Sequence, residues 1–493
     1  MSVNIERTVY GAINFGCGAL AGLTLVYPTV WPVAFISMVP LFFAIIGRNC
    51  TQRQAFMFGY VWGAGLIGVS LSFVFGMLPL DWLGVSAPLV GGVVVTALWV
   101  FLLGVLAIPV GVFGTLLWHM RHVHKLILVA ICPVAWVLLE LIRAIIFSIL
   151  ALGPGTSIGP HFTFAFLGYV FAGAHGLLFL APIGGPLFLS WLVVFVNASL
   201  FFVLQLLFVK RWWAGITACL VFIVGLIVLN AVLPARVHIS VGAGTVEVGG
   251  VSVGLIHTNE EASFELSPDT ALLARTRLEE SIIASLSETP DAKVIILPED
   301  SRFEQVISNP NTSMDHATLE TLAKRQALLI GSGRVDDGQN AHGVLYVYDF
   351  AIGAPIQFSA KSYLVPFGEY VPFVISMFGK IFGFEKPIQN LVDARASYIP
   401  SKWNPEERVV DWNGVSYGIL SCSELFTPYF MRDVAHAGAD VVVLMSSQSW
   451  VKSSSPILFN QMLGMAVVGS AWVGKPYLQA TNGAPNIFIG INH

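Results

Sequence analysis

The chain has 493 residues, of which 56% are hydrophobic and 11% are charged, and its mean hydropathy is +0.76. This composition is far more apolar than that of a soluble globular protein, so it must contain membrane spans. A net charge of −4 without a basic block argues against nucleic acid as a partner. Five scattered cysteines, without a CxxC or Cys/His cluster, indicate neither a disulfide framework nor a metal site.

Seven long apolar stretches fill the first 235 residues, and most reach the roughly 20 residues that a helix needs to cross a bilayer core. They lie at residues 9–30, 31–47, 55–79, 87–118, 126–152, 176–208 and 212–233. The second is short and is preceded by the proline-marked break "YPTVWP", so the first two are either two spans or a re-entrant pair. We therefore expect a membrane helical bundle of about seven spans over residues 1–235.

Basic residues occur in alternate connections between these stretches. They are Arg48 and Arg53, then Arg121 and Lys125, then Lys210 and Arg211. The other connections hold no Lys or Arg, so the positive-inside rule places the N-terminus in the cytoplasm and residues 236–493 outside it. In a bacterium this is a multi-pass inner-membrane protein with a periplasmic domain.

Polar residues inside the apolar stretches are expected to face the bundle interior. In "WVLLELIR", Glu140 and Arg143 share one helix face, which suits either an ion pair that locks helix packing or a substrate contact. Asn197 and the pair Gly184–Gly185 suit close helix approach or a re-entrant turn.

From residue 236 onward, short apolar runs typical of strands alternate with amphipathic helices. The runs "VSVGLIHT", "AKVIILPED", "ALLIGSG" and "ADVVVLMSSQSW" predict strands, and residues 456–474 predict a helix. "HGVLYVYDF" and "IQFSAKSYLV" predict a hairpin. An α/β layered sandwich over residues 236–493 is the fold that this order favours.

The stretch "VSYGILSCSELF" places Cys422 after a buried strand, and helical spacing follows from Glu424 to Ala437. The first N–H groups of a following helix would favour a thiolate there. The alternative is an ordinary buried apolar cysteine.

Two other predicted strands end in groups that complement a thiol, Glu299 after "VIILP" and Lys361 after "QFSA". Acyl transfer through a thiol needs a base, a positive charge for the oxyanion and the nucleophile, which these three residues supply without histidine. Taken singly, a charged residue at a strand end is usually a solvated surface charge.

"LPE", "KSYLVPFGEYVPF" and "CSE" resemble the nitrilase (carbon–nitrogen hydrolase) superfamily, whose fold is an αββα sandwich. Joined to a membrane bundle, the form "K…LVPFGEYVP" resembles the apolipoprotein N-acyltransferase family. So do "WVLLELIR", "FLAPIGGPLFLSWLVVFVNA", "RDVAHAGADVVVLMSSQSW" and "FNQMLGMAVVGSAWVGKPYLQATNG", so the resemblance covers nearly the whole chain.

The resemblance implies Glu299 as general base, Lys361 as stabiliser of the oxyanion and thiolate, and Cys422 as nucleophile. The residues implied around this triad are Glu369, Ser423 and Glu424 as supporting groups and Trp450, Tyr370 and Phe373 as substrate or lid residues. The apolar segment at residues 370–384 is either a lid that touches lipid or a helix packed on the sandwich.

Three departures from that family stand out. Ser423 occupies a position that is usually aromatic, and "GPGTSIGPHF" replaces a shorter "GFPW"-like turn. The family also continues beyond the equivalent of "NIFIGI" with further strands and a closing transmembrane helix, so the resemblance implies that completion of the sandwich, and activity, depend on such strands.

By this resemblance the protein transfers an acyl chain from a phospholipid, through a thioester on Cys422, to the N-terminal amine of a lipoprotein. No cofactor is implied, and a monomer is expected. One alternative is a divergent relative that resembles the conjugal-transfer TraB-like proteins, with another amide or acyl substrate. The other is a catalytically silent envelope scaffold.

Overall fold

The computed structural model describes all residues except 1–2, 49, 81–86, 209–211, 261–267, 290, 300, 337–339, 367, 384–397, 452–455 and 493. Lys210 and Arg211, which contribute to the predicted orientation, and Phe384, which ends the predicted lid segment, therefore lie outside the described residues.

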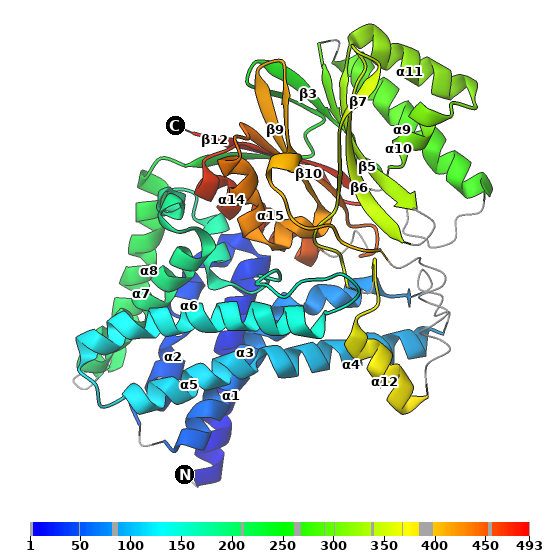
Figure 1. The fold of residues 1–493 in the computed structure, drawn as a ribbon. Coiled ribbons are helices and arrows are strands. Elements are labelled where there is room, and N and C mark those ends of the chain that lie inside the picture. The colour runs from blue at the N-terminus through cyan, green and yellow to red at the C-terminus, as the bar shows by residue number, and fades with distance from the viewer. Residues whose placement is uncertain are drawn as a thin grey trace.

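The N-terminal half is a bundle of apolar helices (Figure 1). Its α-helices are α1 (Val3–Val26), α2 (Val39–Ile45), α3 (Gln52–Ser70), α4 (Pro88–Leu106), α5 (Ile108–Met120), α6 (Lys125–Leu150), α7 (Gly185–Phe208) and α8 (Trp212–Val232). Short 3₁₀ helices connect them at η1 (Pro28–Phe35), η2 (Ser72–Met77), η4 (Leu167–Gly173) and η5 (Leu178–Ile183). The predicted apolar stretches thus form helices, although the fourth is divided into α4 and α5 at Ala107.

The short second stretch is a broken segment, η1 followed by α2, and not a straight helix. The buried Asn197 of α7 satisfies the backbone at the break, because its amide nitrogen donates to Ala34 O at 2.9 Å and its oxygen accepts from Met38 N at 2.9 Å. Gly185, which begins α7, has a φ of +62°, and a Cβ there would lie 2.5 Å from the Trp472 ring. Asn197 and Gly185 therefore both allow neighbouring helices to approach closely.

The C-terminal half contains, among the described residues, two six-stranded sheets. Sheet A has the order β1-β12-β11-β10-β9-β8 and sheet B the order β2-β3-β4-β5-β6-β7. The strands of sheet A are β1 (Val237–Val241), β8 (Val409–Trp412), β9 (Val415–Ser421), β10 (Val441–Ser447), β11 (Tyr477–Asn482) and β12 (Ile487–Ile491). Those of sheet B are β2 (Thr245–Val248), β3 (Val251–Leu255), β4 (Val294–Ile296), β5 (Leu328–Asp336), β6 (Ala341–Asp349) and β7 (Ala354–Ala360).

Helices cover the outer faces of both sheets. Sheet B is covered by α9 (Pro268–Glu288), α10 (Phe303–Ser308) and α11 (Ser313–Arg325), and sheet A by α14 (Pro428–His436) and α15 (Pro456–Val473) (Figure 1). Alternation along the strands fills the layer between the sheets, because Tyr417 and Ile419 face it while Leu420 faces the helices. The domain is therefore an αββα sandwich, as the resemblance implies.

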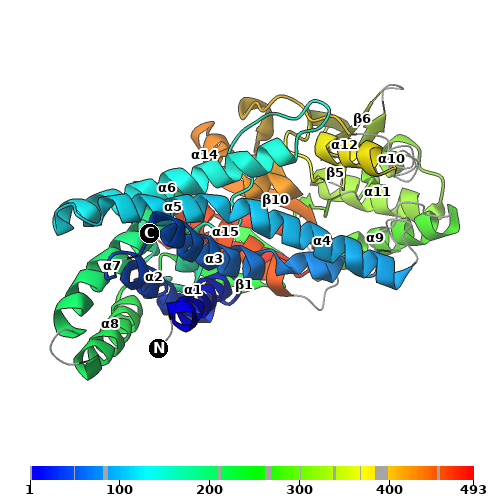
Figure 2. The ribbon, with the colours of Figure 1, turned by 90° about the horizontal axis from the view of Figure 1, so that it is seen from below.

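The sandwich rests on the bundle through α15, which contacts α1, α7, η4 and η5 (Figure 2). Gln461 of α15 donates to Ser70 O of α3 at 2.8 Å. Eight described segments are long and apolar enough to cross a membrane, and α15 is the eighth. Its hydropathy reflects burial between sheet A and the bundle.

Candidate active site

The chain directions bring three predicted residues to one edge of the sandwich. The centres of both sheets are parallel, in β3-β4-β5 and in β9-β10-β11, so the carboxyl ends of these strands meet at one edge. Strand β7 also ends there, because two antiparallel pairings separate it from β5. Glu299 follows β4, Lys361 follows β7 and Cys422 follows β9.

Lys361 is held between two carboxylates. Its Nζ donates to Glu299 Oε1 at 2.8 Å and to the two oxygens of Glu369 at 3.0 and 3.1 Å. Burial alone would lower the pKa of Lys361, but Glu299 and Glu369 outweigh it and raise this pKa well above its ordinary value. Lys361 is therefore a permanent cation in a site that is almost closed to solvent.

Glu369 is itself fixed by its own loop, because Glu369 Oε2 accepts from Val365 N at 2.7 Å. Burial raises the pKa of Glu369, although Lys361 opposes this effect. On the other side, Glu299 Oε1 accepts from Ser421 Oγ at 3.0 Å, which ties Glu299 to the residue before Cys422.

Cys422 begins the 3₁₀ turn η7 (Cys422–Phe426) with a left-handed φ of +36°. The predicted helix from Glu424 is therefore wrong in its first turn. Pro428, a favoured first residue of a helix, begins α14 only after Thr427. The Cys422 side chain is 4% exposed, and its Sγ lies 3.8 Å from Ser447 O at the end of β10.

The thiol is neutral in this arrangement, which corrects the expectation of a preformed thiolate. Burial raises the pKa of Cys422 well above its ordinary value, and the negative charge of Glu299 adds to this effect, while Lys361 only partly offsets it. If Cys422 acts as a nucleophile, its proton has to leave during attack, and Glu299 is the carboxylate that interacts with the thiol.

A buried ion pair fixes the start of the Cys422 turn. Glu424 is fully buried and contacts both Nη atoms of Arg408 at 3.0 and 3.1 Å. Its oxygens also accept from Ser362 N at 2.7 Å and from Ser421 N at 2.8 Å. The loop after Lys361 and the turn of Cys422 are thus tied to one carboxylate. The sequence alone did not indicate a role for Arg408, because its partner Glu424 is not a neighbour in the chain.

The remaining predicted residues lie around this centre. Ser423 Oγ donates to Tyr363 O at 2.6 Å, and Trp450 Nε1 donates to Ser447 O at 3.1 Å, the carbonyl that Cys422 also contacts. Tyr370 is buried, and its hydroxyl donates to Ala151 O at 2.6 Å. Tyr370 is therefore anchored on the bundle, whereas Phe373 at the start of α12 (Phe373–Phe382) is 57% exposed.

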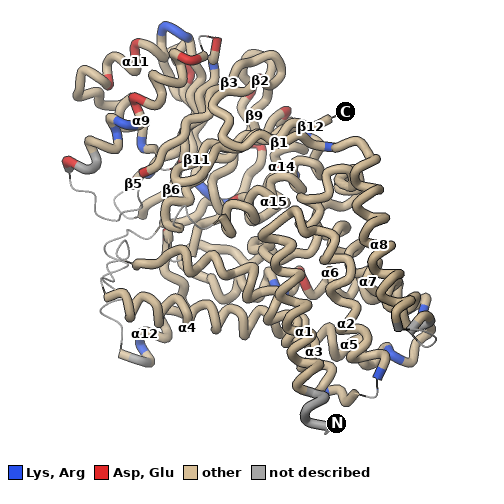
Figure 3. The backbone as a smooth tube through the Cα atoms, turned by 180° about the vertical axis from the view of Figure 1, so that it is seen from behind, with Lys and Arg blue, Asp and Glu red and all other residues tan. Residues whose placement is uncertain are grey.

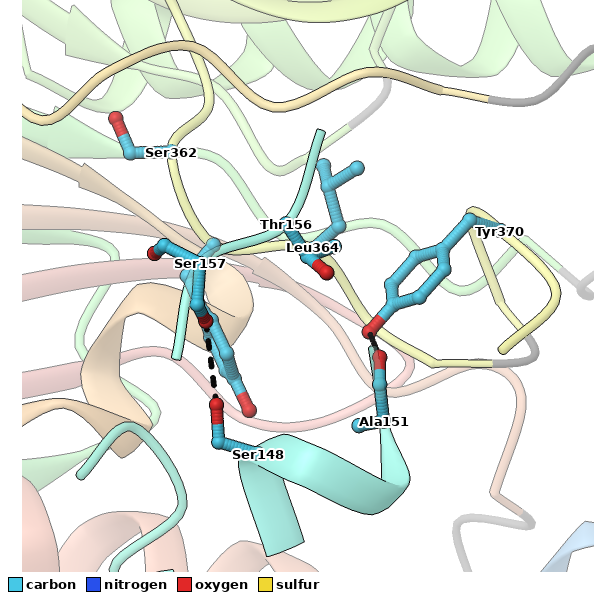
Figure 4. A pocket seen from close by; sticks show the side chains of 8 residues that line it. Ser148, Ala151, Thr156, Ser157, Ser362, Leu364 and Tyr370 are labelled. Carbon is cyan, nitrogen blue, oxygen red and sulfur yellow. Dashed lines mark hydrogen bonds between the residues drawn. The ribbon is translucent and has the colours of Figure 1, made fainter. Parts of the chain in front are cut away.

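A small pocket lies between the end of α6 and the loop after Lys361 (Figure 4). Its lining is mostly hydroxyl-bearing and consists of Ser148, Ala151, Thr156, Ser157, Ser362, Tyr363, Leu364 and Tyr370. Figure 4 shows Ser148 bonded to the Ser157 carbonyl and Tyr370 bonded to the Ala151 carbonyl. Sequence reasoning missed the bundle side of this pocket, since isolated serines and threonines in a connection carry no specific signal. Among the described residues there is no group of three or more His, Cys, Asp or Glu side chains suited to a metal ion.

Residues 17–199 match the family described as the apolipoprotein N-acyltransferase N-terminal domain. Relatives named apolipoprotein N-acyltransferase align along most of the chain. The protein from Haemophilus influenzae is 24% identical over 471 residues, which cover 93% of this chain and 80% of the relative. The one from Vibrio cholerae is 24% identical with 94% and 84% covered, and the one from Geobacter metallireducens is 25% identical with 94% and 82% covered.

Solved structures of lower similarity also match. An amidase of the nitrilase superfamily from Nesterenkonia AN1 is 14% identical with a TM-score of 0.31, covering 51% of this chain and 92% of the amidase. A carbon–nitrogen hydrolase from Helicobacter pylori is 14% identical with a TM-score of 0.30, covering 46% and 73%. Through the matched N-terminal domain and the alignments along most of its length, this chain is similar to the bacterial apolipoprotein N-acyltransferases.

Proposed function

We propose that the protein is a membrane-embedded thiol acyltransferase. Cys422 takes an acyl chain from a phospholipid as a thioester and passes it to the α-amino group of the N-terminal cysteine of a lipoprotein. The observation that carries this proposal is the convergence of Glu299, Lys361 and Cys422 at one sandwich edge in a relative of the N-acyltransferases. A site next to a membrane bundle suits two lipid-borne substrates.

In the first half-reaction, Glu299 accepts the thiol proton while Cys422 Sγ attacks the ester carbonyl of the phospholipid. The new C–S bond forms and the carbonyl oxygen becomes an oxyanion, which the ammonium of Lys361 stabilises. When the ester C–O bond breaks, Glu299 returns the proton to the departing alkoxide, so a lysophospholipid leaves. The neutral resting thiol fits this order, because the anion is needed only during attack.

In the second half-reaction, the amine of the lipoprotein attacks the thioester. Glu299 now accepts a proton from the amine, the N–C bond forms and the C–S bond breaks. The proton on Glu299 then returns to Cys422, and an amide is released. Because the same base and cation serve both halves, the acceptor has to enter from the side that the lysophospholipid vacates.

Supporting residues keep the triad in place. Glu369 shares Lys361 with Glu299, and Glu424 ties the loop after Lys361 to the Cys422 turn. Ser423 holds the same loop through Tyr363 O. Trp450 holds the Ser447 carbonyl beside the thiol, so it supports the surroundings of Cys422.

Helix α12 is a candidate lipid-facing lid. Its exposed apolar side chains include Phe373, Met377 and Ile381, at 57%, 51% and 64% exposure. Phe378 packs edge-on against Phe101 of the apolar helix α4, with ring centroids 6.5 Å apart. The exposed side of α12 thus continues the apolar surface of the bundle, where acyl chains of phospholipids are found.

The periplasmic side of a bacterial inner membrane is the proposed location of the sandwich. Lys and Arg at the α5–α6 connection lie far from the sheets (Figure 3), which supports the positive-inside orientation. A reporter active only in the periplasm should work when fused after Leu233 and fail when fused near Arg53 or Lys125. The reverse pattern would remove access to periplasmic lipoproteins.

Complementation tests the proposed activity against its alternatives. In a strain depleted of its own N-acyltransferase, expression of this chain should restore growth and triacylated lipoproteins, detected by mass spectrometry of a lipoprotein N-terminus. Hydrolysis of a small amide through Cys422 without such restoration would favour a divergent nitrilase-like enzyme. Neither activity would favour a silent scaffold.

A further inference from the structure

Glu140 and Arg143 of α6 are charged side chains inside the apolar bundle, with 2% and 3% exposure. Both bind the backbone of the segment that connects α6 to η4 and contacts the sandwich on its way. Glu140 Oε1 accepts from Leu167 N at 2.9 Å, and Arg143 Nη2 donates to Phe164 O at 3.2 Å. We call residues 161–167 the strap. Charged side chains at membrane depth are costly. Because two of them bind this one short segment, its position is under strong constraint.

The strap holds the far end of the Cys422 turn. Thr163 donates twice to Phe426 O, from its backbone N at 3.3 Å and from its Oγ1 at 2.9 Å. The Phe164 ring packs edge-on against the Phe426 ring, with centroids 4.7 Å apart. Thr427 Oγ1 donates to His161 O at 3.1 Å. Phe426 is the last residue of η7, whose first residue is Cys422.

A second set of contacts joins the strap to Trp450 and through it to the Ser447 carbonyl, which contacts the Cys422 thiol. The Phe164 ring lies 5.3 Å from the Phe73 ring, which lies 6.4 Å from the Trp450 ring. Trp450 Nε1 donates to Ser447 O, the carbonyl in contact with Cys422 Sγ. The strap therefore supports the surroundings of the thiol from two sides.

We propose that Glu140 and Arg143 are positioning residues that fix the strap, and that the strap fixes the η7 turn and thereby the place of Cys422 Sγ relative to Glu299 and Lys361. This inference rests on the proposed role of Cys422 as nucleophile. A left-handed φ at a residue other than glycine persists only where its surroundings enforce it. Glu424 enforces it at the start of the turn, and the strap enforces it at the end.

Two single variants interrupt this route at different points. Arg143→Met removes the donor to Phe164 O. Thr163→Val removes, with little change of shape, the hydroxyl that donates to Phe426 O and also bonds the Tyr169 hydroxyl. Arg143→Lys keeps the charge and a donor. Asn197→Ala is the matched control, because Asn197 is an equally buried polar residue of the bundle that binds Ala34 O and Met38 N and not the strap.

Two rates are measured on folded protein: thioester formation with phospholipid, and alkylation of Cys422 by neutral iodoacetamide, read from the Cys422 peptide. Both interrupting variants should form the thioester about tenfold to a hundredfold more slowly, since small misplacement of a reacting group has effects of this order. Both should alkylate Cys422 severalfold faster, because a relaxed turn exposes the thiol. Arg143→Lys should recover most of the loss, and Asn197→Ala should match the unmodified protein in both rates.

The double variant Arg143→Met with Thr163→Val should be no worse than the more severe single variant, because both act through the strap. Multiplied effects, or unchanged rates in Thr163→Val, would overturn the proposal. Thr163 decides the matter if Arg143→Met fails to fold. Should no phospholipid acylate Cys422, the proposed function fails, yet the alkylation rates still test the positioning role.

Discussion

Lys361 Nζ lies 2.8 Å from Glu299 Oε1 while it also contacts both oxygens of Glu369, so two carboxylates share one ammonium. This cluster lies in a nearly closed site. Glu299 keeps the free lone pairs that a base needs, and Lys361 keeps the charge that an oxyanion needs. Glu369 prevents the ammonium from pairing with Glu299 alone.

Glu369→Gln should therefore slow formation of the acyl-thioester by about tenfold or more, because Lys361 would pair fully with Glu299 and weaken it as a base. The measurement is the initial rate of acylation with phospholipid. Glu320→Gln, on the exposed surface of α11, serves as the control. An unchanged rate in Glu369→Gln would show that Glu369 does not support the triad.

The neutral thiol gives a prediction for pH. Because burial and Glu299 raise the pKa of Cys422, its alkylation by iodoacetamide should rise steadily up to about pH 10 without reaching a plateau. Glu299→Gln removes a neighbouring negative charge, so the profile should move to lower pH while thioester formation falls. A plateau below about pH 8 in the unmodified protein would show a preformed thiolate instead.

If α12 is a lid that touches lipid, changes in its exposed side chains should affect lipid substrates more than water-soluble ones. Replacing Phe373, Met377 and Ile381 of α12 by Ser should slow acylation from phospholipid vesicles while sparing acylation from a short soluble ester. Ile352→Ser is the control, since Ile352 is 65% exposed in the turn between β6 and β7. Equal loss with both substrates would favour a purely structural α12.

The buried pair Arg408–Glu424 gives a stability prediction. Arg408→Met leaves the Glu424 carboxylate buried without its counter-charge, which costs about 3–5 kcal/mol of unfolding free energy. Thermal unfolding of the detergent-solubilised protein measures this loss. Arg432→Met, which breaks the more exposed pair with Asp433, should have little effect. Similar melting temperatures for the two variants would contradict the role of Glu424 as the tie between the two loops.

Local patterns were sufficient to predict the three residues at strand ends. Glu299, Lys361 and Cys422 each follow a run whose alternation and length indicate a strand, and the parallel strand order then brings them together. Asn197 was likewise recognisable, because a polar side chain in an apolar helix suits close helix approach or a re-entrant turn. These inferences need only neighbouring residues and general rules of topology.

Contacts between distant segments were not predictable in this way. Arg408 reaches Glu424 across a hairpin, and Glu140 and Arg143 bind the strap, 27 and 21 residues further along the chain. The neutral thiol depends on burial and on the Glu299 charge, which override the expected effect of a helix N-terminus. Hydropathy alone would make α15 a candidate span, because a helix buried between a sheet and a bundle is as apolar as one in lipid. Its place among the predicted strands of residues 236–493 is what assigned it to the sandwich.

Intact mass measurement shows whether Cys422 carries an acyl chain from a phospholipid. Purified protein incubated with phospholipid and no acceptor should gain the mass of one acyl chain, and hydroxylamine should remove it, as expected for a thioester. Cys422→Ala should abolish the adduct, and Glu299→Gln and Lys361→Ala should each slow its appearance by roughly a hundredfold or more. An adduct that persists in Cys422→Ala, or the absence of any adduct in the unmodified protein, would show that Cys422 is not the acyl carrier.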